Sequence, residues 1–427
     1  MPASADRLHS IDHWSAVSCR AHSAASRCRS HRRSAARSAP CSVAWPPTMV
    51  VIGFPRLPRI SLEREEEYRM AAFGETPEGT IEILNIVPMR GPGGILAPSC
   101  EAAISLAAEE INAGAGILGR EIRTTNIDGG RAPELVATEV AALLATGMVD
   151  AITGWHTSAV RRAVAAANGG RVPYLFATSH EGLPDEQPGV LMLGEHPAGH
   201  TLAAVRWARR ELGVRRWAII GNDYIWPREI AKAVRRVLTD PADVVLEQFV
   251  PHGLPDHTDF LTHPALDRAD GVLILMVGAE VAAFNRQFAA TGRADRQMRL
   301  SPAADENVLL AAGPAAHRNL FVPSSFFLGD RCADGAARRA RYRRRYGAFA
   351  PALTTFSNAA YEALHTLAGL AGAVGSLEVP RLHRALLDGV RYQTPGGTRG
   401  FRGNQAVQTG YLARVNGVDF EIVDRIW

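Results

Sequence analysis

The stretch IEILNIVPMRGPGG, residues 81–94, decides the fold of this chain. Its first half, 81–87, is a nearly continuous apolar run, which is typical of a parallel strand covered by helices on both faces. A Gly/Pro loop follows, and a second strand rich in β-branched residues is expected over 122–127. The small and apolar side chains between the two strands recur at helical spacing: Cys100, Ala103, Ile104, Ala107 and Ile111. This first segment is therefore a βαβ step.

The same alternation continues along the chain, broken once by a Pro/Gly-rich passage over 184–197. Because strand and helix alternate, the strands are expected to form parallel sheets. The expected strands are 149–153, 172–176, 217–220, 244–250, 272–277 and 320–322, and the expected helices are 133–145, 161–167, 202–212, 229–238, 337–346 and 357–371. The basic helix 337–346 is interpreted as a solvated face, and binding of an anionic partner is the less favoured interpretation.

A chain of 427 residues is too long for one ordinary core and fits two domains of roughly 150 residues beside its N-terminal stretch. We predict an α/β fold with two Rossmann-like lobes, each built on a parallel central sheet, joined by a hinge. The first lobe is expected to comprise 79–198 and about 323–365. The second lobe is expected to comprise 199–322 and about 366–427.

Residues 1–78 are interpreted as a disordered or mis-annotated extension, with translation beginning near Met49 or Met70. The segment is rich in arginine, and a nucleic-acid tail is the less favoured interpretation because it has no aromatic interleaving. The apolar stretch 41–54 is broken by two prolines, so no clear signal peptide is present. We therefore expect a cytoplasmic protein, or a periplasmic or cell-surface one if the start is misassigned.

The remaining composition excludes several classes of protein. No run approaches the roughly 20 apolar residues of a membrane-spanning helix, so direct membrane insertion is not expected. Of the cysteines, only Cys100 and Cys332 fall in the expected lobes, and their spacing predicts neither a disulfide framework nor a metal site. Nucleotide-binding motifs, GxSxG and HExxH are all absent, so no catalytic residues and no cofactor are assigned.

Polar and aromatic residues follow three of the expected strands, at the edge where open α/β sheets bind ligands. His156, Thr157 and Ser158 follow the strand 149–153, and Ser158 either caps the next helix or contacts a ligand. Phe176, Thr178 and His180 stand at the end of the next strand. Tyr224 and Trp226 follow the strand 217–220, where they either close over a ligand or pack the hinge.

These segments resemble the type I periplasmic-binding-protein superfamily, in particular the amide sensors and the urea- and short-amide-binding proteins of ABC importers. The segment GNDYIWPRE, 221–229, is similar to G-S-D-Y-[IV]-[YF]-P-R of that branch. Thr157-Ser158 with RRAV, 161–164, is similar to S-x-x-R-K-A-V, and His180-Glu181-Gly182 is similar to Y-E-G. The resemblance spans about 81–422.

The resemblance implies a set of ligand contacts in a cleft between the lobes. They are His156, Thr157, Ser158, Phe176, Thr178 and His180 of the first lobe and Tyr224, Trp226 and Gly278 of the second, with Val277 beside Gly278 at the floor. The sequence departs from the branch where tyrosine is usual, with His156, Phe176, His180 and Trp226 in its place. These changes suggest that the ligand is larger, aromatic or acidic rather than acetamide or urea.

We therefore expect a receptor that makes no covalent change to its ligand, a short amide, urea or related compound. Its partner is an ABC permease or a cytoplasmic regulator, a homodimer is compatible with the pattern, and no nucleic-acid partner is expected. A branched-chain amino acid or an aromatic acid is the alternative ligand. An amide hydrolase that uses His156, Ser158 and His180 is the alternative from another class.

Overall fold

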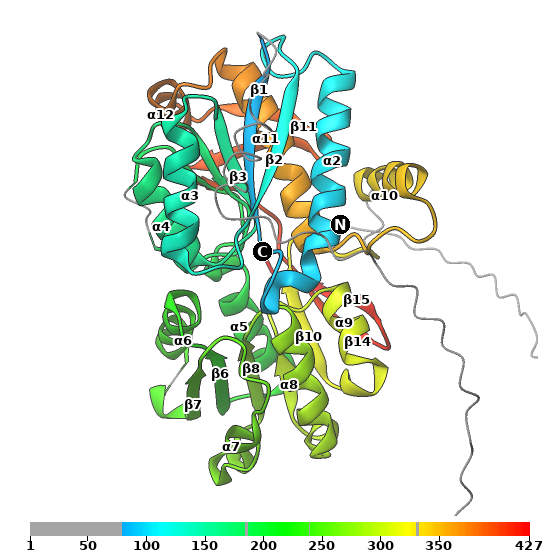
Figure 1. Ribbon diagram of the computed structural model, residues 1–427. Coiled ribbons are helices and arrows are strands. Elements are labelled where there is room, and N and C mark those ends of the chain that lie inside the picture. The colour runs from blue at the N-terminus through cyan, green and yellow to red at the C-terminus, as the bar shows by residue number, and fades with distance from the viewer. Residues whose placement is uncertain (1–78, 184–186, 239, 330–332) are drawn as a thin grey trace, which may run out of the picture. The chain divides into compact units, whose positions relative to one another are not determined.

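The computed structural model of the protein describes residues 79–183, 187–238, 240–329 and 333–427. These residues belong to one compact unit, Glu63–Trp427. The predictions made for 1–78, and for Cys332, lie outside the described residues. In the described part, strands and helices alternate and build two sheets, each with helices on its two faces (Figure 1).

The first sheet has eight strands in the order β11-β12-β13-β5-β4-β3-β1-β2. Its strands are β1 (Ile81–Val87), β2 (Ile122–Asp128), β3 (Ala151–Gly154), β4 (Tyr174–Phe176), β5 (Val190–Met192), β11 (Arg391–Thr394), β12 (Gly397–Arg402) and β13 (Gln405–Ala406). The pairs from β13 through β5, β4, β3 and β1 to β2 are parallel, whereas β11, β12 and β13 pair antiparallel to one another.

Residues of β1 alternate between two hydrophobic cores. Leu84 and Ile86 pack in the core with α3 (Pro133–Ala145) and α4 (Ser158–Asn168), which lie side by side on that face (Figure 1). Ile83 points to the other face, which is covered by α2 (Ala97–Ala113) and α11 (Thr355–Val374). This two-sided burial explains why the strand is apolar at nearly every position.

The second sheet has seven strands in the order β15-β14-β10-β9-β8-β6-β7. Its strands are β6 (Trp217–Asn222), β7 (Val244–Val250), β8 (Gly271–Leu275), β9 (Met298–Leu300), β10 (Leu320–Ser324), β14 (Tyr411–Asn416) and β15 (Asp419–Arg425). Residues of α5 (Thr201–Leu212) and α6 (Ile225–Val237) share one core with it, and residues of α7 (Thr258–Leu261), α8 (Ala279–Ala290) and α9 (Glu306–Ala312) share the other.

The chain passes between the two sheets after β5, after β10 and after β13. The α/β fold of two lobes with largely parallel sheets, predicted from the sequence, is confirmed. The antiparallel strands at one end of each sheet come from the C-terminal part of the chain, so the sheets are mixed rather than wholly parallel.

The hairpin β11–β12 and the strand β13 that follows it lie in a different sheet from the one expected. The sequence interpretation assigned all of 366–427 to the second lobe, whereas β11 to β13 extend the first sheet beyond β5. The reason is local, because α11 packs on α2 and the hairpin that follows packs against α11 through the buried ring of Tyr392. The chain returns to the second sheet only at β14.

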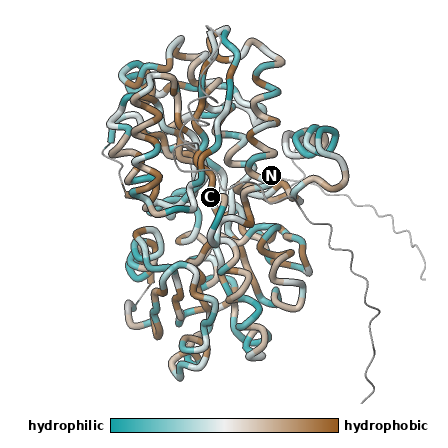
Figure 2. Tube along the Cα trace, viewed as in Figure 1, coloured by the Kyte–Doolittle hydropathy of each residue, from teal (hydrophilic) through white to brown (hydrophobic). Residues whose placement is uncertain are grey.

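Two further features qualify the sequence interpretation. The basic helix α10 (Ala333–Tyr346) is largely hydrophilic, as Figure 2 shows, yet Arg338 is buried and Arg341 bonds to Glu110 of α2. Cys100 is a buried free thiol inside α2, as the helical spacing predicted, and burial raises its pKa. The helices α7, α8, α9 and α12 (Val379–Leu387) and the strands β5 and β9 were not predicted.

Among the described residues, no helix combines the length and the apolar character needed to cross a membrane.

Candidate functional site

The first part of the site follows β3. Gly154 ends this strand at φ 150°, and a Cβ there would overlap the backbone oxygen of Ile86 in β1, so glycine is required at this close approach. Thr157 then caps α4, with its hydroxyl oxygen accepting a hydrogen bond from the N–H of Val160 at 3.4 Å. The helix-capping role that the sequence left open for Ser158 thus belongs to its neighbour Thr157.

The second part follows β4, which pairs parallel with β3. The N–H of His156 donates to the Oγ1 of Thr178 at 3.1 Å, and this bond joins the two strand ends. Since the hydroxyl oxygen of Thr178 accepts this bond, its own O–H can still donate to a ligand. The sequence argument that adjacent strand ends meet at one edge of the sheet is therefore confirmed for this pair.

The imidazole of His156 is held by two neighbours. Its Nδ1 lies 3.3 Å from the backbone oxygen of Thr157, which can only accept, so Nδ1 carries the proton. Its Nε2, 2.8 Å from the hydroxyl of Tyr174, accepts that hydroxyl's hydrogen. Burial lowers the pKa of His156 to about 3, so the ring is neutral at physiological pH. Both ring nitrogens are thus used in structural hydrogen bonds.

Ser158 belongs to a buried polar group beneath the cavity. Its hydroxyl donates to Oε2 of Glu181 at 2.7 Å, and Oε1 of the same carboxylate accepts from Arg161 at 2.6 Å. Glu181 is 5% exposed and Arg161 is 2% exposed, so this ion pair is shielded from water. Because the serine proton is already donated, Ser158 presents an acceptor oxygen rather than a donor.

The third part comes from the second lobe. β6 ends at Asn222, and Tyr224 is the residue that precedes α6. The rings of Tyr224 and Trp226 are stacked, with centroids 6.4 Å apart and planes at 26°. The ring of Tyr224 also packs against that of His252, with the ring centroids 5.1 Å apart. Burial raises the pKa of the Tyr224 phenol, so its hydroxyl stays protonated.

A small cavity lies where these parts meet. Its lining residues are Trp155, His156, Thr157, Ser158, Thr178, Ser179, Tyr224, Trp226, Val277, Ala303 and Phe356. Most of the ligand contacts expected from the sequence are therefore brought together here. The lining combines aromatic rings with hydroxyl groups at the start of one helix, which is the composition of a small-ligand pocket.

Three of the expected contacts do not line this cavity. Phe176 is fully buried in the core with α3 and α4, because alternate residues of β4 face opposite sides of the sheet. His180 is buried, and its Nδ1 accepts from the N–H of Gly182 at 3.1 Å. Gly278 adopts φ 56° ahead of α8, and its backbone approaches that of Pro92 so closely that a Cβ would overlap the Pro92 oxygen.

Trp155, Ser179, Ala303 and Phe356 line the cavity but were not assigned from the sequence. Trp155 and Ser179 adjoin assigned residues, so the strand-end argument could have included them. Phe356 lies in the first turn of α11, and its ring packs 4.8 Å from that of Trp155. No local pattern could have placed it there. The buried Nε1 of Trp155 has no partner among the described residues.

No cluster of three or more His, Cys, Asp or Glu side chains suited to a metal ion occurs among the residues that the structure describes.

Comparison with known proteins identifies the family. Residues 80–419 match a family model described as periplasmic binding protein. The chain belongs to this family. The proteins of this family bind solutes and are not enzymes, so this periplasmic binding protein is a non-catalytic, solute-binding protein, and the hydrolase alternative is set aside.

Solved periplasmic binding proteins share the fold. LivJ, the branched-chain amino acid transporter substrate-binding protein from Streptococcus pneumoniae solved with isoleucine, is 19% identical with a TM-score of 0.69, covering 81% of this chain and 99% of LivJ. A solute-binding protein from R. palustris, solved with benzoate, is 18% identical with a TM-score of 0.70, covering 82% and 96%.

The leucine-binding protein LivK from Thermotoga maritima is 18% identical with a TM-score of 0.70, covering 81% of this chain and 98% of LivK. At these identities the likeness concerns the fold of the periplasmic binding protein and not its ligand.

Proposed function

We propose that this protein binds a small aromatic carboxylate in the cavity beside Thr178 and Trp226 and delivers it to an ABC permease. The observation that carries the proposal is the ring of four aromatic side chains in the cavity wall: Trp155, Tyr224, Trp226 and Phe356. Aromatic walls favour a flat, apolar ligand body through offset or edge-to-face contacts. Solved relatives with benzoate and 3,4-dihydroxybenzoic acid support this choice.

The polar side of the cavity suits a carboxylate. The first N–H groups of α4 have no carbonyl partner within the helix, and the helix dipole favours negative charge at this end. The O–H of Thr178 is a further donor, since its oxygen already accepts from His156. A carboxylate in front of Ser158 and Ala159 would accept these hydrogen bonds, while its ring would lie against Trp226.

A branched-chain amino acid fits the cavity less well. Its α-ammonium group needs an anionic or strongly accepting partner. None of the described residues that line the cavity is Asp or Glu, and the nearby carboxylate of Glu181 is already engaged by Arg161 and Ser158. An aromatic carboxylate needs no such partner.

The short amides and ureas implied by the segment 221–229 form the other ligand class to be tested. A primary amide can accept at the same helix end and donate to the oxygen of Ser158. It would leave much of the aromatic wall uncovered, which is why we prefer an aromatic ligand. Benzamide, which combines the ring with the amide, separates the two requirements.

Ligand binding is proposed to act through hinge closure. The ligand first contacts the strand ends of the first sheet, and Tyr224 and Trp226 of the second lobe then cover it. The connections after β5, β10 and β13 supply the hinge. The permease recognises the closed form. A cytoplasmic regulator and a homodimer partner are the alternatives to the permease, and the genes that neighbour this one distinguish between them.

The test is isothermal titration calorimetry of the full chain with benzoate, 4-hydroxybenzoate, benzamide, acetamide, urea and isoleucine. Benzoate or its hydroxylated form is expected to bind, and Trp226→Ala is expected to weaken binding roughly tenfold or more, because buried aromatic contacts of this kind contribute over about 1.4 kcal/mol. Phe349→Ala, which removes a fully exposed ring, is the matched control and should leave the Kd unchanged.

Binding of acetamide or urea without binding of benzoate would move the ligand to the amide class. Binding of isoleucine alone would favour the amino-acid alternative. If Trp226→Ala and Phe349→Ala bind benzoate equally well, the ligand does not occupy this cavity.

A further inference from the structure

A second cavity, with a volume of about 250 Å³, lies beside α10, α11 and the hairpin β11–β12. None of the described residues in its lining is shared with the aromatic cavity. Its wall includes residues from each passage between the sheets, among them Leu193 after β5, Phe326 after β10 and Gln408 after β13. A ligand here would therefore contact the hinge and not the strand ends that hold the solute.

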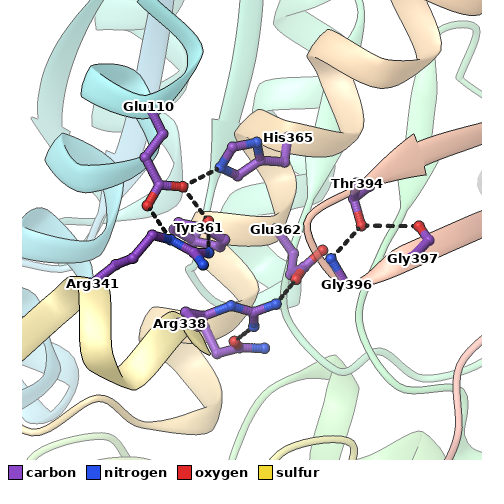
Figure 3. A network of polar contacts seen from close by, with 10 residues as sticks. Glu110, Arg338, Arg341, Tyr361, Glu362, His365, Thr394, Gly396 and Gly397 are labelled. Atoms are coloured by element: carbon purple, nitrogen blue, oxygen red, sulfur yellow. Dashed lines mark hydrogen bonds and ion pairs between the residues drawn. The ribbon is translucent and has the colours of Figure 1, made fainter. Parts of the chain in front are cut away.

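Arg338 brings a buried positive charge to this cavity. It is 4% exposed, its guanidinium donates to Asn358 and pairs with Glu362, and it lies 4.8 Å above the ring of Tyr361. Figure 3 shows the arginine reaching from α10 toward Glu362 on α11. The Nε of Arg338 has no partner among the described residues, so the guanidinium retains a donor that Glu362 does not engage.

Arg399 of β12 brings a second positive charge to the same point. A carbon placed on Gly396 would lie 2.5 Å from Nη2 of Arg399, 3.1 Å from Oε1 of Glu362 and 3.4 Å from Nη2 of Arg338. These three groups therefore converge beside the hairpin turn at Gly396, which Figure 3 shows facing Glu362. Within the described part of the chain, no carboxylate lies within ion-pair distance of Arg399.

The charges of the lining do not balance. Arg338, Arg399 and Glu362 are its charged members among the described residues, which leaves one positive charge in excess. The buried Oε1 of Gln408 also lacks a partner there, while its Nε2 is bonded to Leu193. Buried polar groups are normally satisfied, so an unpaired guanidinium donor and an unpaired amide oxygen in one cavity point to a polar occupant.

We propose that this cavity binds a small oxyanion, a carboxylate or a phosphate, between Arg399 and Arg338. The two guanidinium groups supply charge-assisted hydrogen bonds to its oxygens, and a hydroxyl on the anion can donate to Gln408. This site is separate from the aromatic cavity and does not depend on which solute that cavity holds. Because its wall includes all three connections, the bound anion should alter the affinity for the solute.

The experiment is calorimetry of the full chain with acetate, lactate and inorganic phosphate as probes, in buffers matched in ionic strength with chloride. At least one probe is expected to bind the unaltered protein. Arg399→Gln is expected to weaken that binding roughly tenfold or more, because a charge-assisted hydrogen bond is lost. Arg399→Lys, which keeps the charge, should recover part of it. Arg344→Gln, an exposed arginine of α10, is the matched control.

Trp226→Ala separates this proposal from the proposed function, since it should impair solute binding and leave the oxyanion site intact. Lactate bound more tightly than acetate supports the hydroxyl contact, and phosphate bound alone identifies an inorganic ligand. The proposal is overturned if none of the three probes binds. It is also overturned if Arg399→Gln and Arg344→Gln behave alike, or if Trp226→Ala removes the anion together with the solute.

Discussion

Ser158, in the wall of the cavity with Trp226, donates a hydrogen bond of 2.7 Å to Glu181, although the two residues follow different strands. The same carboxylate holds Arg161 at 2.6 Å, so one buried acid ties the first turn of α4 to the loop after β4. The relationship fixes the position of the helix end that we propose to bind the ligand. It also makes Glu181 the counter-charge of a buried guanidinium.

Glu181→Gln is expected to destabilise the protein by about 3–5 kcal/mol, because it leaves the buried guanidinium of Arg161 without its counter-charge. Urea denaturation measures the change. Glu421→Gln removes a carboxylate from an exposed pair with Arg414 and should cost less than about 1 kcal/mol. Equal losses for the two variants would contradict the structural role assigned to the buried pair.

The protein should lose stability as the pH falls from 7 to 5, in part through His180. Burial lowers the pKa of His180 to about 3 from an ordinary value of 6.5. The unfolded chain therefore takes up a proton below pH 6.5 while the folded protein does not, so acidification favours unfolding. His180→Asn keeps an acceptor for Gly182 and should reduce this loss, as measured by urea midpoints at both pH values. His383→Asn, an exposed histidine of α12, should leave it unchanged.

Asp305 predicts an effect in the opposite direction. Its side chain caps α9 by accepting from the N–H of Val308 at 2.9 Å, and burial raises its pKa to about 7 from 3.8. Between these values the unfolded chain has lost a proton that the folded protein retains, so this group's contribution to stability falls as pH rises. Asp305→Asn preserves the cap and should stabilise the protein more at pH 8 than at pH 5. A difference that does not change with pH would refute this assignment.

Gly278→Ala should be much more damaging than Gly292→Ala, although both positions have positive φ. At Gly292 a Cβ meets nothing within 4 Å, so the cost is only the backbone strain of about 1 kcal/mol. At Gly278 the Cβ also overlaps the oxygen of Pro92, and the displacement moves Val277 in the cavity wall. Thermal denaturation compares stability, and titration with the identified ligand compares Kd.

The sequence predicted the parts of the fold that carry a strong local signal. The strand Ile81–Val87 and the helix Pro133–Ala145 have the bounds that were expected, because a continuous apolar run and a helical start at proline are both visible locally. The strands β5 and β9 have three residues each, which is too short for any periodicity to appear. The strands β11 to β13 were assigned to the second lobe with the rest of 366–427, because the strand that they pair with is decided by tertiary packing.

The candidate site shows the same division. Thr178 and Trp226 were expected because each follows the end of a strand, β4 of the first sheet and β6 of the second, and both line the cavity. Phe176 was expected in the cavity wall but packs in the core instead. Side chains alternate between the two faces of the sheet, and Phe176, the last residue of β4, faces α3 and α4. Phe356 could not be found, because it reaches the cavity only after the chain has passed through the second sheet and back.

The late arrival of the hairpin has a consequence for synthesis on the ribosome. β5 pairs with β13, so one edge of β5 stays open until residues near 405 have left the exit tunnel. An unpaired strand edge is a template for wrong pairing with other chains. Slow translation or truncation before the hairpin should therefore yield aggregated nascent chains, and a chaperone that shields this edge would have to remain bound until almost the whole polypeptide has been made.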